Sequence, residues 1–170
     1  LGDGDASAFR SELSQYDSID IIRKEVIAGD LSKIKQYDRL ILSYHQDTSS
    51  PWNDYEIAVS DKELINKLSN TASVVLVNFT SPYALSKLKS TLSIDAIINL
   101  YQNHPIAQNV AASIIYGARQ TSGKLPVSVS KAYPEGSGLR SKNLYRLYND
   151  LPQNAGFSEK KLARVDSMVK

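Results

Sequence analysis

Short apolar runs alternate with amphipathic segments along the first 130 residues of the chain. Five runs have the length and the β-branched character of strands, and they cover residues 19–22, 40–44, 74–79, 94–100 and 125–129. The run from Val74 to Val77 is apolar throughout, which is typical of a parallel strand covered on both faces. Pro126 cannot donate to a ladder, so the last run is expected either at a sheet edge or unpaired at that point.

Helix-start signals separate these runs. They are Asp30 before residues 31–34, the capping box of residues 60–63, Ser81 with Pro82, and Pro105. The alternation predicts an α/β fold, a three-layer α/β/α sandwich with an open, mostly parallel sheet of about five or six strands in a flavodoxin-like arrangement. Residues 1–5 resemble the turn after a strand, so the first strand is expected to be truncated.

The periodic pattern divides the chain into three parts. Residues 1–135 carry the α/β pattern and are predicted to form one domain. In residues 136–155 the periodicity fades among prolines and glycines, which predicts an extended wrap or linker. Residues 156–170 return to an amphipathic helical pattern and are predicted to start a following domain.

Composition narrows the class of protein. Hydrophobic residues make up 42% of the chain and charged residues 22%, as in a globular domain, and no apolar run approaches the roughly 20 residues that span a bilayer. The absence of cysteine excludes disulfides, zinc–thiolate sites and thiol catalysis. Basic residues gather near the end, among them Arg140, Lys142 and Arg146, but they form no nucleic-acid-binding motif, so we expect a solvated or docking surface and no nucleic-acid partner.

Residues 106–129, which read IAQNVAASIIYGARQTSGKLPVSV, are the most informative segment. They combine a small-residue helix, a glycine stop at Gly117, a loop, and a Ser-Gly-Lys-Leu-Pro-Val segment that leads into a predicted strand. This combination resembles the end of the C-terminal α/β domain of family 3 glycoside hydrolases. Members of that family often carry Gly-Asp-x-Asn-Pro-Ser-Gly-Lys-Leu-Pro, whereas residues 117–126 lack the Asp, the Asn and the first Pro.

The same segment contains glycines and Lys124 that suggest a phosphate-binding P-loop. That interpretation fails because the spacing is one residue too long and Leu125 stands where a Ser or Thr would meet magnesium. The helix also precedes the strand here, which is the reverse of the P-loop order.

The resemblance implies a non-catalytic accessory domain of an enzyme that hydrolyses β-glycosidic bonds. β-N-Acetylglucosaminides, such as peptidoglycan fragments, are the favoured substrate class. In that family an N-terminal (β/α)8 barrel supplies the nucleophilic aspartate, so the resemblance implies such a barrel as partner and a carbohydrate as substrate. It also favours an exported bacterial protein of the periplasm or cell envelope, although a cytoplasmic one remains open, and it implies no cofactor.

Candidate binding residues lie in the loops after the predicted strands, where open α/β sheets bind ligands. Trp52, Asp54, Asn78 and Asn103 could line a carbohydrate-facing rim, because sugars are bound by polar groups and by aromatic faces. The alternative is that these side chains cap helices or cover the sheet. We assign no catalytic residue and no metal ligand, since His45 and Asp47 lack a third ligand.

Two other functions stay open from the sequence. The chain could be a stand-alone flavodoxin-like module that binds a small sugar or nucleotide. Residues 156–170 resemble the opening helix of β-lactamase-like serine hydrolases, and Ser167 with Lys170 matches their S-x-x-K pattern. This pair lies on the first amphipathic helix at the chain end, so catalysis by it is not the favoured interpretation.

Overall fold

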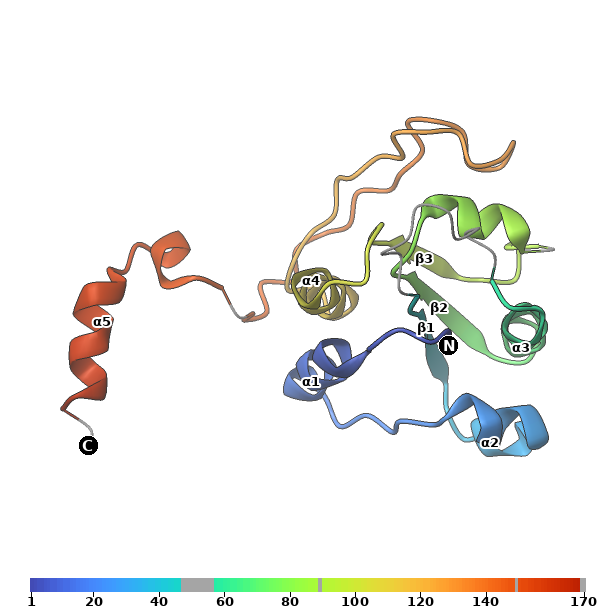
Figure 1. The fold of residues 1–170 in the computed structure, drawn as a ribbon, viewed down its shortest axis with the longest axis horizontal. Helices are drawn as coiled ribbons and strands as arrows, with labels where there is room; N and C mark the ends of the chain where they lie inside the picture. Colours follow the sequence, from blue (N-terminus) through green and yellow to red (C-terminus); the bar gives the residue numbers. More distant parts are fainter. Residues whose placement is uncertain (47–56, 89, 149, 169–170) are drawn as a thin grey trace.

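The computed structural model of the chain describes residues 1–46, 57–88, 90–148 and 150–168. Its centre is a parallel sheet in the order β1-β2-β3 (Figure 1), formed by β1 (Arg39–Tyr44), β2 (Ser73–Asn78) and β3 (Ala96–Asn99). Leu42 lies opposite Leu76, and Val77 lies opposite Ile98. β2 is the central strand, and its Val74, Leu76 and Val77 are buried, as the continuous apolar run predicts.

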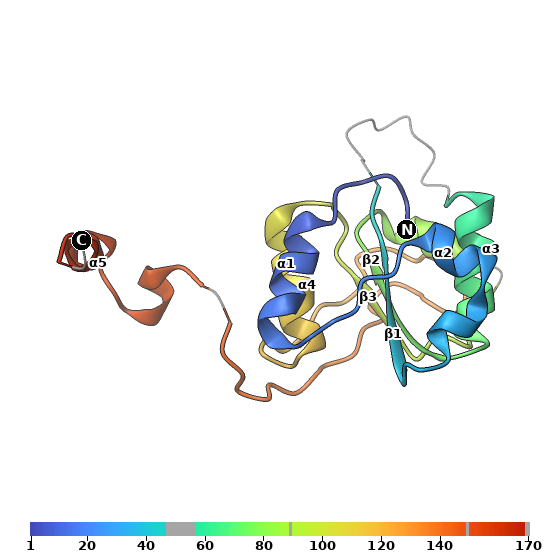
Figure 2. The same cartoon turned by 90° about the horizontal axis from the view of Figure 1, so that it is seen from below.

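Helices cover both faces of the sheet (Figures 1 and 2). On one face lie α1 (Ser7–Tyr16) and α4 (Pro105–Ile115), and the core there joins Phe9 to Val77, Phe79 and Ala111. The other face carries α2 (Lys24–Gly29), η1 (Leu31–Ile34), α3 (Val59–Ser69) and η2 (Pro82–Lys87). The predicted α/β/α sandwich is therefore confirmed.

The local signals around α4 act as the sequence predicts. His104 is the N-cap and its Nδ1 accepts the Ile106 amide hydrogen at 3.2 Å, and Pro105 occupies the first turn. Gly117 ends the helix with φ +71°, and a Cβ there would also meet the Leu144 side chain. Alanines rather than Ile106 face the core, because Ile106 is 68% exposed. The small side chains let α4 pack closely against α1.

The prediction of a strand at residues 19–22 is wrong for this structure. These residues are neither helical nor paired, and they connect α1 to α2. They form no ladder with β1, and Ile21 is 58% exposed. A segment becomes a strand only when it forms backbone hydrogen bonds with a neighbouring strand. None of the described strands pairs with residues 19–22.

The prediction of a sheet strand at residues 125–129 is also wrong. The Leu125 amide donates to the Ser137 carbonyl at 2.8 Å, and the Gly136 amide donates back to the Leu125 carbonyl at 2.8 Å. The Val129 amide donates to the Tyr133 carbonyl at 2.9 Å. The segment therefore folds back as an irregular hairpin, consistent with a proline that interrupts any ladder at Pro126.

The end of the chain leaves the sandwich. Residues 136–144 bond back to residues 117–125, and the Leu144 amide donates to the Gly117 carbonyl at 2.7 Å. Beyond them, η3 (Pro152–Ala155) and α5 (Glu159–Asp166) extend away from the sheet (Figure 1). The division of the chain at residues 135 and 155 stays a prediction.

Leu1 and Gly2 add a short parallel bridge to the free edge of β1. The Leu1 nitrogen donates to the Ser43 carbonyl at 2.8 Å, and the His45 amide donates to the Leu1 carbonyl at 3.0 Å. Gly2 has φ +76°, and a Cβ there would collide with the His45 carbonyl. Glycine is therefore required where this segment turns away from β1.

Asp61 holds this segment from the other side. Asp61 is buried; its Oδ2 accepts the Gly2 amide hydrogen at 2.9 Å and its Oδ1 pairs with Lys24 Nζ at 3.0 Å. The sequence places Asp61 inside a capping box, but the N-cap of α3 is Ala58 and no side chain caps it. The predicted capping box of residues 60–63 is therefore wrong, and Asp61 in the first turn of α3 makes tertiary contacts instead.

We expect Asp61→Ala to lower the free energy of unfolding by about 2 to 3 kcal/mol, since it leaves the Gly2 amide and Lys24 without their acceptor. Urea unfolding followed by circular dichroism measures this change. Glu63→Ala is the matched control, because Glu63 is exposed on the same helix and should change stability by less than about 0.5 kcal/mol. Equal losses in the two variants would support the capping box instead.

Candidate functional site

The candidate site lies at the carboxyl ends of the three strands. β1 leads into His45 and Gln46, β2 into Phe79 and Thr80, and β3 ends at Asn99. Residues 1–6 cross this edge before α1, and the Gly4 amide donates to the His45 carbonyl at 3.1 Å. Parallel strands that end together bring these polar side chains to one edge of the sheet, where α/β folds bind ligands.

His45 lies inside this edge and is 1% exposed. Its ring stacks on Phe79 with centroids 4.4 Å apart, and Phe9 approaches it at 6.0 Å. Burial lowers the pKa of His45 from 6.5 to about 4, against the opposing effect of its hydrogen bond with Asn103. His45 is therefore neutral at pH 7.

The hydrogen bonds of Asn103 fix the protonated nitrogen of His45. Asn103 Nδ2 donates to the Asp5 carbonyl at 3.0 Å, so Oδ1 is the atom that faces His45 Nδ1 at 2.9 Å. Since that amide oxygen can only accept, Nδ1 carries the hydrogen. The lone pair is left on Nε2, which is buried and has no hydrogen-bond partner among the described residues.

Gln108 of α4 is 2% exposed, and its side-chain amide bonds to α1, to the loop of residues 1–6 and to Asn103. Its Oε1 accepts the Phe9 amide hydrogen at 2.8 Å, which joins α4 to α1. Its Nε2 donates to the Asp5 carbonyl at 2.8 Å and to Asn103 Oδ1 at 2.7 Å. One buried amide on α4 thus connects α1, the loop of residues 1–6 and Asn103, which follows β3.

A second pair of amides joins β2 to β3. Asn78 Nδ2 donates to Asn99 Oδ1 at 2.6 Å and also contacts the carbonyls of Thr80 and Ser81 at 3.2 and 3.1 Å. Asn78 Oδ1, Asn99 Nδ2 and Thr80 Oγ1 are buried without a partner among the described residues. Buried polar atoms of this kind are costly and are common where a protein binds something polar.

The structure brings together two of the four residues predicted to bind sugar. Asn78 and Asn103 both lie at the carboxyl edge, and each makes internal hydrogen bonds that position loops. Trp52 and Asp54 lie outside the described residues. The assignment of all four residues to sugar binding stays a prediction.

Sequence patterns did not identify Gln108 or Asn99 as site residues. Gln108 follows Ala107 on a helix whose apolar pattern dominates, and only its complete burial reveals its role. Asn99 does carry a signal, because it ends an apolar strand as Asn78 does. An asparagine at the end of two neighbouring strands is a pattern that could have been recognised.

The described residues give little support for a metal site or for catalysis by Ser167 and Lys170. These residues include no group of three His, Asp or Glu side chains that could hold a metal ion. Ser167 is exposed near the end of α5 and its hydroxyl donates to the Arg164 carbonyl at 2.7 Å, whereas Lys170 lies outside the described part of the chain. The described helices include none that is long and apolar enough to cross a membrane.

Part of the basic end of the chain is engaged by aromatic rings. The Arg119 guanidinium lies 4.0 Å from the centre of the Tyr148 ring and pairs with Asp150 at 3.5 Å. Arg146 lies over Tyr116 at 6.0 Å. These contacts hold the extended segment near the end of α4.

Comparison with known proteins identifies one family. Residues 4–162 match the family model described as the glycosyl hydrolase family 3 C-terminal domain. No curated protein and no solved structure gave a significant match.

Gln108→Leu should lower the free energy of unfolding by about 2 to 4 kcal/mol, because it leaves the buried Phe9 amide without its acceptor and removes one of the two side-chain donors to the Asp5 carbonyl. Thermal and urea unfolding provide the measurement. Gln102→Leu is the matched control, since Gln102 is exposed one turn before α4. If both variants unfold like the parent chain, Gln108 does not hold the site together.

The stability of the chain should fall between pH 6.5 and pH 4 because of His45. The unfolded chain binds this proton with a pKa near 6.5 and the folded chain only near 4, so acid favours unfolding. The contribution is complete above pH 6.5, decreases down to pH 4 by about 3 kcal/mol in total, and is constant below. Urea unfolding across this range measures it.

His45→Phe should remove this part of the pH dependence while it keeps a ring stacked on Phe79. His104→Asn should retain it, because His104 is exposed and asparagine also caps helices. An unchanged pH profile in the His45 variant would show that another group is responsible.

Proposed function

The chain belongs to the glycosyl hydrolase family 3 C-terminal domain family, and from this membership we propose that it is a non-catalytic accessory domain of a family 3 glycoside hydrolase. The observation that carries the proposal is the family match over residues 4–162, together with the α/β/α sandwich that contains them. Its partner is the catalytic domain of the same enzyme, and the substrate of that enzyme is a carbohydrate.

The groups at the carboxyl edge support a role other than bond cleavage. Glycoside hydrolysis uses two carboxyl groups, about 5 Å apart in retaining enzymes. The buried side-chain groups described at this edge are amides, the Thr80 hydroxyl and a neutral imidazole. The nearby Asp61 carboxylate already pairs with Lys24 and accepts from the Gly2 amide. Amides of this kind position loops or bind hydroxyl groups, and neither role requires a proton transfer.

We further propose the finer identity that the sequence resemblance suggests. The catalytic partner would be an N-terminal (β/α)8 barrel, and the substrate a β-N-acetylglucosaminide such as a peptidoglycan fragment. The enzyme would be an exported bacterial protein with residues 156–170 opening a β-lactamase-like domain. The amphipathic α5, with Leu162 and Val165 on one stripe, is compatible with a helix that packs against such a domain.

The chain by itself should release no nitrophenol from 4-nitrophenyl N-acetyl-β-glucosaminide above the rate in buffer, because the nucleophile belongs to the partner domain. Absorbance of the released nitrophenolate measures this. Joined to the catalytic domain of its parent enzyme, the chain should raise kcat/KM at least about tenfold over that domain alone, as expected for a group that positions a substrate loop.

Two results would contradict the proposal. Robust turnover by the chain alone would make it a catalyst. Saturable binding of N-acetylglucosamine by the chain alone, with a Kd below about 1 mM and no effect on the catalytic domain, would favour the stand-alone binding module.

A further inference from the structure

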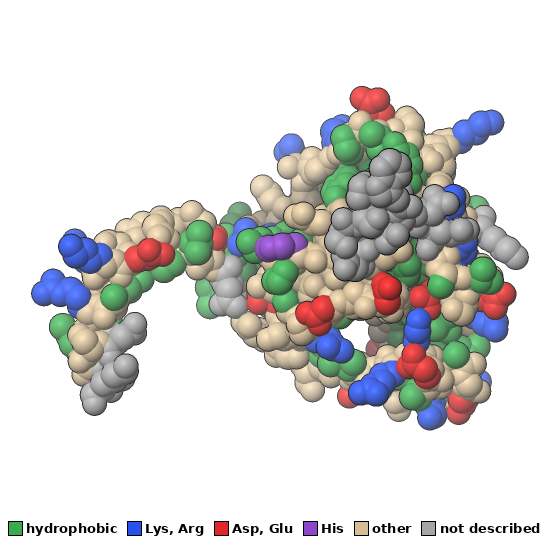
Figure 3. Space-filling model, in the orientation of Figure 1, with side chains coloured by type: hydrophobic (Ala, Val, Ile, Leu, Met, Phe, Trp, Pro, Cys, Tyr) green, Lys and Arg blue, Asp and Glu red, His purple; other side chains and the backbone are tan. Residues whose placement is uncertain are grey.

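An exposed segment with apolar and basic side chains runs over residues 138–148, where the chain leaves the sandwich. We call these residues the basic strap. Three of its large side chains are almost fully exposed, namely Leu139 (89%), Tyr145 (89%) and Leu147 (91%). Figure 3 shows hydrophobic and basic side chains together on the surface at this place, between α4 and α5. Clusters of exposed apolar side chains mark surfaces that bind something.

The basic strap is fastened to the domain. The Leu144 amide donates to the Gly117 carbonyl at 2.7 Å. At the far end of the strap, the Arg119 guanidinium lies 4.0 Å from the centre of the Tyr148 ring. The exposed side chains between these points are therefore presented on a fixed frame, and a ligand that binds them orders little additional backbone.

Side chains alternate between the two sides of the strap. Leu144 lies against Gly117, and Arg146 lies over an aromatic ring at the same end of α4. Tyr145 and Leu147, the intervening positions, point away from the domain, which accounts for their exposure. The outward side of the strap thus carries an aromatic ring next to an aliphatic side chain.

Tyr145 has an unusual backbone conformation. Its φ is +56°, in the left-handed region that residues other than glycine, asparagine and aspartate rarely adopt. Asn143 stabilises this turn, because its Oδ1 accepts the Tyr145 amide hydrogen at 2.7 Å. Residues held in such conformations are common at ligand sites, and this one places an aromatic ring in solvent.

The charge of the basic strap is positive throughout. Arg140, Lys142 and Arg146 are exposed, and residues 136–148 contain no acidic side chain. Arg140 and Lys142 form no ion pair with any residue that the structure describes. An arginine guanidinium binds a carboxylate through two parallel hydrogen bonds. The strap therefore favours a ligand that carries negative groups.

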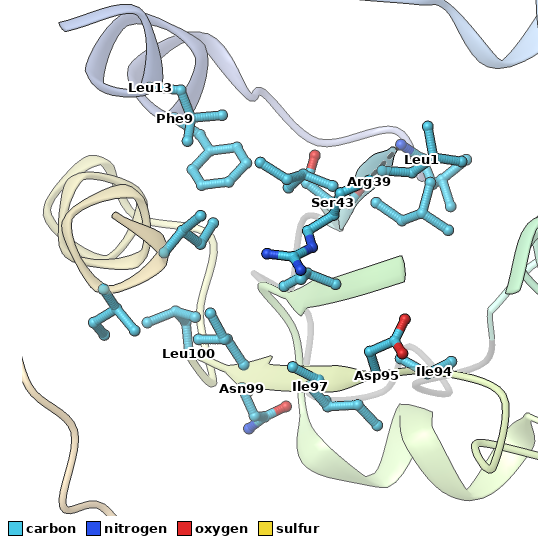
Figure 4. Close-up of a pocket in the computed structure, with 18 of the residues that line it drawn as sticks. Leu1, Phe9, Leu13, Arg39, Ser43, Ile94, Asp95, Ile97, Asn99 and Leu100 are labelled. Atoms are coloured by element: carbon cyan, nitrogen blue, oxygen red, sulfur yellow. Dashed lines mark hydrogen bonds between the residues drawn. The ribbon is translucent and has the colours of Figure 1, made fainter. Parts of the chain in front are cut away.

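Other parts of the molecule lack this combination. The large cavity has a volume of about 1690 Å³, and among the residues labelled in Figure 4 only Arg39 and Asp95 have charged side chains, which are of opposite sign. The carboxyl edge carries buried amides and a neutral imidazole. It also lies at the other end of α4 from the strap, since His104 caps the start of that helix and Gly117 ends it.

We propose that the basic strap is a carbohydrate-binding surface separate from the carboxyl edge, and that it takes an acidic glycan, a sugar chain that carries carboxylate groups. The choice of ligand rests on the proposed function, because the chain belongs to a carbohydrate-active enzyme family. Tyr145 stacks on the apolar face of a sugar ring with Leu147 beside it. Arg140 and Lys142 bind carboxylates of the same chain of sugars.

The mixture of side chains distinguishes an acidic glycan from other anions. A ligand held by charge alone makes no use of Tyr145 and Leu147, which are among the most exposed groups of the strap. A neutral sugar makes no use of Arg140 and Lys142. An acidic glycan engages both sets, since its rings have apolar faces and its carboxylates accept hydrogen bonds from cations.

Titration of the chain with tetragalacturonate, followed by NMR of the backbone amides, tests the proposal. We expect saturable shifts at residues 139–147, with a Kd of about 1 mM or below. Maltotetraose, which has no carboxylate, should bind at least about tenfold more weakly. Tetraglutamate, which has carboxylates but no sugar ring, should also bind at least about fivefold more weakly.

Variants separate the two kinds of contact. Tyr145→Ala should raise the Kd for tetragalacturonate at least about fivefold, whereas Tyr83→Ala, which removes an exposed tyrosine from η2, should leave it unchanged. The double variant R140Q/K142Q should raise the Kd about tenfold. Its matched control is K33Q/K35Q, since both lysines are exposed on the other side of the sheet core.

Several results would overturn the proposal. These are shifts confined to the carboxyl edge, equal affinity for tetragalacturonate and tetraglutamate, or no effect of Tyr145→Ala. Saturable binding to phosphatidylglycerol vesicles without binding to tetragalacturonate would also overturn it and would assign the strap to a lipid surface. The titration uses the chain alone, so its failure would leave the kinetic test of the accessory role with the catalytic domain unaffected.

Discussion

A β-strand has hydrogen-bonding groups on two edges, and the structure depends on what meets the two edges of β1. The inner edge is satisfied by β2 over its whole length. Among the described residues, partners meet the outer edge at its carboxyl end, where Leu1 and Gly4 bond to Ser43 and His45. This contact places residues 1–6 across the ends of the strands, and the buried amides and His45 are arranged around that crossing.

The crossing explains why so many polar groups are buried at one end of a small sheet. A loop that lies over strand ends brings its own carbonyls into the interior, and each needs a donor. Asn103 and Gln108 both donate to the Asp5 carbonyl, and Asp61 accepts from Gly2. The polar cluster therefore has a structural function that is complete in itself. If these residues also bind a sugar, the first atoms available for hydrogen bonds are the buried ones without a partner among the described residues, such as Asn78 Oδ1 and Asn99 Nδ2.

The sequence predicts the parts of this fold that depend on local patterns. The three strands that formed, the start of α4 at Pro105 and its end at Gly117 all follow from residue types and spacing. The wrong predictions concern segments whose structure depends on contacts with residues far away in the sequence. Residues 19–22 have strand character but pair with none of the described strands, and residues 125–129 bond to their own hairpin. The start of α3 has no side-chain cap, and Asp61 in its first turn binds Gly2 and Lys24. For the same reason Gln108 could not be assigned, since its importance comes from three contacts that converge in space.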